Sequence, residues 1–61
     1  SKREKDVLRQ LAMGHDATRI SEELSISWNT VRTHTRNVYA KLGVHSRQEV
    51  VDLVDSYKDR Y

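Results

Sequence analysis

The 61-residue chain lacks cysteine, proline and phenylalanine, and it has only two glycines. Without cysteine it can form neither a disulfide nor a thiolate zinc site, and its three histidines do not have the spacing of a metal-ligand set. No apolar run approaches the ~20 residues of a membrane span, and no targeting or lipidation motif stands out. We therefore expect no metal, no cofactor and no membrane partner, and a cytoplasmic location.

The scarcity of helix breakers predicts an all-α fold. Gly14 and Gly43 both stand where a helical pattern stops, and few stretches show the alternation of a β-strand. Apolar residues at helical spacing predict four helices, at about residues 2–13, 17–24, 27–42 and 46–57. The second and third are joined by a turn of about three residues, as in a helix-turn-helix. We expect one four-helix domain over residues 1–61, with a core worth only ~3–5 kcal/mol.

Capping residues mark where these helices begin. Ser1–Glu4 and Ser46–Glu49 have the form of capping boxes, and Asp16 and Ser27 are the expected N-caps of the second and third helices. The apolar stripes would meet in one core, formed by Val7, Leu8, Leu11, Ala12, Ala17, Ile20, Leu24, Ile26, Val31, Val38, Leu42, Val44, Val50, Leu53, Val54 and Tyr57.

Charge is distributed unevenly along the chain. No Asp or Glu occurs between Leu24 and Gln48, whereas this window holds four of the eleven Lys and Arg residues and two of the three histidines. The net charge is only +2, so the asymmetry, rather than the total, favours a polyanionic partner. The predicted helix 27–42 occupies the middle of this window.

The predicted helix 27–42 has one apolar and one polar side. Val31, Val38 and Leu42 form its inner stripe. At roughly 100° per residue, the opposite side carries Asn29, Arg32, Thr33, Arg36, Asn37 and Ala40. Such groups can hydrogen-bond base edges or touch a thymine methyl in a major groove. An ordinary solvated face is the alternative interpretation, and the missing acids argue against it because exposed helices usually mix both signs.

Five motifs follow one another in a fixed order and spacing: Arg3–Leu8 (R-E-x-E-V-L) leading to Ala12–Gly14, Ile20–Leu24 (I-A-x-x-L), Ile26–His34 (I-S-x-x-T-V-K-x-H), Lys41–Val44 (K-L-x-V) and Ser46–Arg47. Together they make nearly the whole chain resemble the LuxR-type (FixJ/NarL-type) helix-turn-helix domain of bacterial transcription regulators. Residues 16–19 depart from the family's S-N-K-E, and Arg32 replaces a common lysine with a bidentate fork.

The resemblance implies roles for individual residues. Base contacts would come from Arg32, Thr33 and Arg36, which the helical periodicity also places outward. DNA backbone contacts would come from Ser27, Trp28, Asn29, Thr30, Asn37, Lys41 and Arg47. For Trp28, packing on the second helix is the favoured alternative to a sugar–phosphate contact. His34 flanks the apolar stripe, so we expect it to pack, with a phosphate hydrogen bond left open.

The fourth helix carries more apolar residues than one face can bury. In the family this helix commonly pairs two copies on DNA, which implies dimer contacts at Val51, Val54 and Asp55. One recognition helix covers too few base pairs to select a genomic site, so we expect inverted half-sites about one turn apart and a homodimer that is weak without DNA. The resemblance also implies that the chain is the C-terminal output domain of a longer regulator.

Two function classes compete. The first is sequence-specific binding of double-stranded DNA by a transcription regulator; the second is an adaptor or sigma-like module that contacts RNA polymerase. The acid-free window favours DNA. We expect no enzyme activity, because the sequence has no nucleophile–base–orienter set, phosphate loop or metal cluster.

Overall fold

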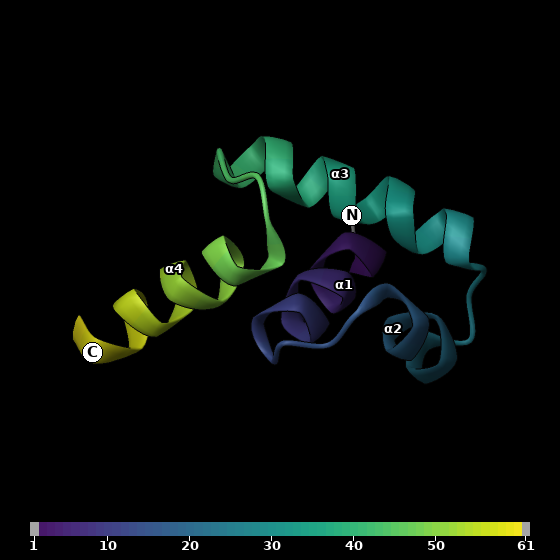
Figure 1. The fold of residues 1–61 in the computed structure, drawn as a ribbon, viewed down its shortest axis with the longest axis horizontal. Helices are drawn as coiled ribbons and strands as arrows, with labels where there is room; N and C mark the ends of the chain where they lie inside the picture. Colours follow the sequence, from purple (N-terminus) through teal and green to yellow (C-terminus); the bar gives the residue numbers. More distant parts are fainter. Residues whose placement is uncertain (1, 61) are drawn as a thin grey trace.

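The computed structural model describes residues 2–60, and for residues 59 and 60 the backbone alone. It contains four helices: α1 (Lys2–Ala12), α2 (Ala17–Leu24), α3 (Trp28–Leu42) and α4 (Arg47–Arg60) (Figure 1). No strand occurs among residues 2–60. The all-α, four-helix prediction is therefore confirmed, and α4 extends three residues beyond the predicted end at Tyr57.

The α2–turn–α3 unit is held by hydrogen bonds between residues close in sequence. The Asp16 carboxylate accepts from the Arg19 amide at 2.9 Å and caps α2. The Ser27 hydroxyl accepts from the Thr30 amide at 3.1 Å and caps α3. Both N-caps are as predicted, because a short polar side chain can satisfy an amide of the first turn.

The ends of α2 and α3 use left-handed backbone. Gly43 ends α3 with φ 69°, as predicted, and Ser25 ends α2 with φ 55° although it carries a Cβ. The Ser25 amide donates to the Ser21 carbonyl, and the Ser21 hydroxyl donates to the Ile26 carbonyl at 2.9 Å. These bonds hold the three-residue turn tightly, so α3 leaves α2 in a defined direction.

One of the two predicted capping boxes differs from expectation, and the other includes a residue that the structure does not describe. At the start of α4, the Ser46 hydroxyl accepts from the Glu49 amide at 3.2 Å, which is half of the box. The Glu49 carboxylate accepts from the His45 amide instead of the Ser46 amide, so the reciprocal bond lies one residue outside the box. Ser1 lies outside the described residues, and the Glu4 side chain bonds to α3.

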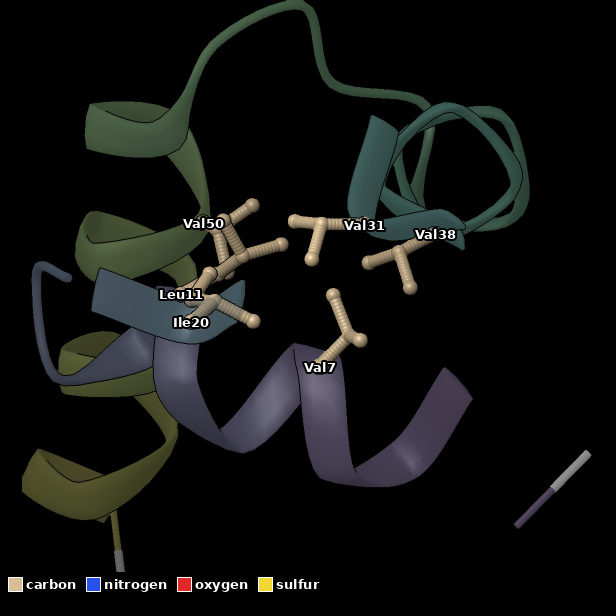
Figure 2. Packing of buried hydrophobic residues seen from close by; sticks show 6 residues of the cluster. All are labelled: Val7, Leu11, Ile20, Val31, Val38 and Val50. Atoms are coloured by element: carbon tan, nitrogen blue, oxygen red, sulfur yellow. The ribbon is translucent and has the colours of Figure 1, made fainter. Parts of the chain in front are cut away.

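One aliphatic core joins the four helices. Its buried residues are Val7, Leu11, Ile20, Val31, Val38 and Val50, with at least one from each helix (Figure 2). Figure 1 shows α1 in the middle of the molecule, and α2, α3 and α4 all pack against it. The core thus fixes α3 through its apolar stripe and leaves the opposite side uncovered.

The sequence pattern misplaced one aromatic residue and did not place another. Tyr57, which we expected in the core, is 58% exposed, because the last turns of α4 extend beyond the other helices (Figure 1). Tyr39, which the pattern did not single out, is partly buried against the core. None of the helices in residues 2–60 is long and apolar enough to cross a membrane.

Candidate nucleic-acid interface

The candidate interface is the outer side of α3. Figure 1 shows α3 along one edge of the molecule, with the other three helices on one side of it. Val31 and Val38 are buried on its inner side. The residues predicted to face outward are all exposed: Asn29, Arg32, Thr33, Arg36, Asn37 and Ala40. Their exposure agrees with the helical periodicity.

Two rows of side chains at i, i+4 spacing divide this outer side. The first row is Trp28, Arg32, Arg36 and Ala40, and the second is Asn29, Thr33, Asn37 and Lys41. Each row meets a different neighbour. The first borders a hollow beside the start of α2, whereas the second lies next to α1.

The first row borders an open hollow of about 600 Å³. It is lined by Ala17, Arg32, Thr35, Arg36, Tyr39, Ala40, Gly43, Val44 and His45. Burial raises the pKa of the Tyr39 phenol above its ordinary value of 10.0, and the positive charge of Arg47 partly offsets this rise. Arg47 therefore lies close enough to Tyr39 to act on its hydroxyl electrostatically.

Trp28 and Arg32 lie against each other within the first row. The guanidinium carbon of Arg32 lies 5.1 Å from the centroid of the Trp28 ring, which is a cation–π distance. Trp28 is 49% exposed. Trp28 is therefore not a buried residue, and one partner of its ring is a charged side chain of its own helix, while packing on the second helix stays a prediction.

The second row holds a carboxylate that comes from α1. Lys41 Nζ donates to Glu4 Oε1 at 2.6 Å, and Asn37 Nδ2 donates to Glu4 Oε2 at 3.2 Å. These partners, the Lys41 bond foremost, lower the pKa of Glu4 below its ordinary value of 4.5. The Glu4 side chain is only 15% exposed, and that of Lys41 is 65% exposed. The window that is free of acids in sequence is thus not free of them in space.

Two threonines of the interface make hydrogen bonds within α3. The Thr30 hydroxyl lies 2.8 Å from the Ser27 hydroxyl at the N-cap. The Thr33 hydroxyl donates to the Asn29 carbonyl at 3.1 Å. Its proton is therefore occupied, while its methyl group and a lone pair remain exposed.

The histidines lie in different surroundings. His34 is half-buried, and its Nδ1 is buried without a hydrogen-bond partner within residues 2–60, which fits the expected packing role. The His15 ring bonds to the Gln10 side chain. In the described part of the chain, no group of three His, Cys, Asp or Glu side chains could hold a metal ion.

The residues predicted for dimerisation lie on α4, which packs on α1. Val51 is half-buried and Asp55 is exposed. Val54 is half-buried and packs against the core, so part of its surface already stabilises the monomer. Of the three, Val51 and Asp55 thus offer the freer surface.

The fold and the basic outer side of α3 define a helix-turn-helix domain of the DNA-binding class. The sequence model of the family described as "Bacterial regulatory proteins, luxR family" matches residues 1–54, and the chain belongs to this family. It is therefore a DNA-binding domain of transcription regulation.

Several characterised proteins share this domain. The chain is 41% identical over 58 residues to the Fimbriae Z protein of Salmonella typhimurium, covering 95% of the chain and 28% of that protein. It is 44% identical over 52 residues to the HTH-type transcriptional activator RamA of Corynebacterium glutamicum, covering 85% of the chain and 18% of that protein. It is 43% identical over 51 residues to the HTH-type transcriptional regulator MalT of Yersinia pestis, covering 84% of the chain and 6% of that protein. The chain thus spans less than a third of the length of these relatives.

Proposed function

We propose that the chain binds double-stranded DNA sequence-specifically, with α3 in the major groove. The observation that carries this proposal is the uncovered outer side of α3, where Arg32 and Arg36 are exposed. Within the described residues, neither guanidinium pairs with a carboxylate. Unpaired arginine forks on a helix of this kind suit guanine O6 and N7, which accept two parallel hydrogen bonds.

The base-reading residues are Arg32, Thr33 and Arg36. Arg36 and Thr33 lie near the centre of the outer side, and Arg32 lies toward its Trp28 edge. Because the Thr33 hydroxyl already donates to its own helix, its methyl group is the part suited to a thymine methyl. These side chains would discriminate between base pairs, while residues around them fix the position of the helix.

Phosphate contacts come from the edges of α3 and from the start of α4. At the N-terminal end they are Ser27, Trp28, Asn29 and Thr30; toward the C-terminal end they are Asn37, Lys41 and Arg47. An ammonium has three N–H donors, so Lys41 can bind Glu4 and a phosphate together. Glu4 then orients Lys41 and also reduces the net positive charge offered to DNA.

The regulator would act as a pair of such domains. One recognition helix covers only a few base pairs, so two copies on inverted half-sites would supply the required specificity. We propose that α4, through Val51, Val54 and Asp55, forms a weak homodimer contact that is stable on DNA. The chain would be the output domain of a longer cytoplasmic regulator without catalytic activity, in keeping with the share of its relatives that it spans.

Selection of bound sites from random duplex DNA tests the proposal directly, and substitutions then assign the roles. Arg32→Ala and Arg36→Ala should each weaken binding to the selected site by roughly 1–3 kcal/mol and flatten preference at one or two base pairs. Lys41→Ala should weaken all duplexes about equally and reduce the salt slope by about 1.

Lys58 on α4 is a matched control for the loss of one positive charge. It is exposed and borders a groove between α1 and α4, away from the outer side of α3. Lys58→Ala should leave half-site binding unchanged. If the arginine substitutions weakened selected and random duplexes by equal amounts, the base-reading roles would be wrong; if no site were selected, specific binding itself would be wrong.

A further inference from the structure

The contact between Trp28 and Arg32 is a feature that DNA binding alone does not require. Trp28 is the first residue of α3, and Arg32 follows one helical turn later. The guanidinium carbon of Arg32 lies 5.1 Å from the ring centroid, although half of the Trp28 surface is exposed. Exposing a large apolar ring to water is unfavourable, so a half-exposed tryptophan that contacts a single arginine calls for an explanation.

A cation–π contact restrains an arginine without using its hydrogen bonds. A guanidinium close to an aromatic ring is attracted by the π-electrons of the ring, and this attraction does not require its N–H groups to donate to another hydrogen-bond acceptor. The donors of Arg32 therefore stay available to a base edge while its side chain loses rotational freedom. Arg36, the other base-reading arginine, has no such ring contact among the described residues.

We infer that Trp28 is a positioning residue that holds the Arg32 guanidinium in the orientation needed to read one base pair. This inference rests on the proposed function. A side chain restrained before binding loses less entropy on binding, and the gain applies only to sequences that Arg32 can hydrogen-bond. Trp28 thus raises specificity through Arg32, in addition to any backbone contact of its own.

The first test uses the free 61-residue chain. Trp28 is the only tryptophan, so fluorescence emission reports on this ring alone. Arg32→Ala should uncover the ring and increase its quenching by acrylamide, whereas Arg36→Ala, which removes the same charge one turn further on, should leave quenching unchanged. Equal quenching in wild type and Arg32→Ala would overturn the inference whether or not the chain binds DNA.

The second test is a double-mutant cycle on DNA. Trp28→Ala should lower the preference for the selected base pair read by Arg32 by about two- to tenfold, the size expected from freeing one long side chain. Trp28→Phe should restore most of this preference, because phenylalanine also offers a ring face. In the Arg32→Ala background, Trp28→Ala should change the preference no further. Circular dichroism checks that each variant is folded.

Tyr57→Ala is the matched control, since it removes another exposed aromatic ring, from α4. It should leave the base preference on a single half-site unchanged. If Trp28→Ala weakened every duplex equally, or if its effect persisted without Arg32, Trp28 would be a backbone contact only and the inference would be wrong. In that result wild type still selects a site, which separates it from failure of the proposed function.

Discussion

Shortening Val31 to alanine should destabilise the domain without altering its recognition surface. Val31 is 0% exposed and points from α3 into the core (Figure 2). Loss of two methyl groups costs about 1.6 kcal/mol at ~0.8 kcal/mol each, and an unfilled cavity adds up to about 1 kcal/mol. Alanine is the better helix former and returns about 0.5 kcal/mol. The net loss should be about 1–2 kcal/mol.

This loss is large for such a small core. With ~3–5 kcal/mol of total stability, Val31→Ala should lower the Tm by roughly 4–16 °C, at about 4–8 °C per kcal/mol. Thermal and urea denaturation followed by circular dichroism measure the change. Thr33→Ala is the matched control, because Thr33 is exposed on the other side of the same helix and should change stability by no more than about 0.5 kcal/mol.

Measurements of DNA affinity distinguish the role of the inner side of α3 in stability from the role of its outer side in binding. Below the melting transition, Val31→Ala should keep most of its affinity for the selected site, because the outer side chains are untouched. Equal destabilisation by Val31→Ala and Thr33→Ala would refute the packing argument. A large loss of DNA affinity in a folded Val31→Ala chain would show that the inner side of α3 contributes to DNA binding and not only to stability.

Three further outcomes follow from other contacts. Since the folded-state pKa of Glu4 is lowered, its stabilising effect should be present above its ordinary pKa of 4.5 and be lost as the pH falls through the lowered value. Thermal melts should therefore show a gap between wild type and Glu4→Gln that closes in acid, and a gap independent of pH would contradict the pairing with Lys41. Gly43→Ala should cost roughly 1 kcal/mol in denaturant melts because φ is 69° and no atom crowds a Cβ there, while Gly43→Asn should cost less; equal costs would argue against a left-handed end of α3. Val51→Lys should reduce cooperativity on a two-site operator in band-shift titrations and leave single half-site affinity nearly intact, and a tight dimer without DNA in sedimentation would contradict the weak α4 contact.

Features that depend on neighbouring residues could be predicted from the sequence. Asp16 and Ser27 cap helices through amides three residues away, and Gly43 ends α3 through its own backbone angle. The exposure of Arg32 and Arg36 opposite Val31 follows from the helical repeat alone. These interactions lie within one or two helical turns, so local order in the chain is enough to determine them.

Features that join distant segments were decided by the tertiary structure. Glu4 meets Asn37 and Lys41 across 33 and 37 positions of the sequence, and this pairing exists only because α1 packs against α3. Tyr57 belongs to an apolar stripe but stays exposed because the last turns of α4 extend beyond the other helices (Figure 1). Periodicity states which side of a helix is apolar; the angle and overlap of the helices determine what that side meets, and these depend on packing the whole core at once.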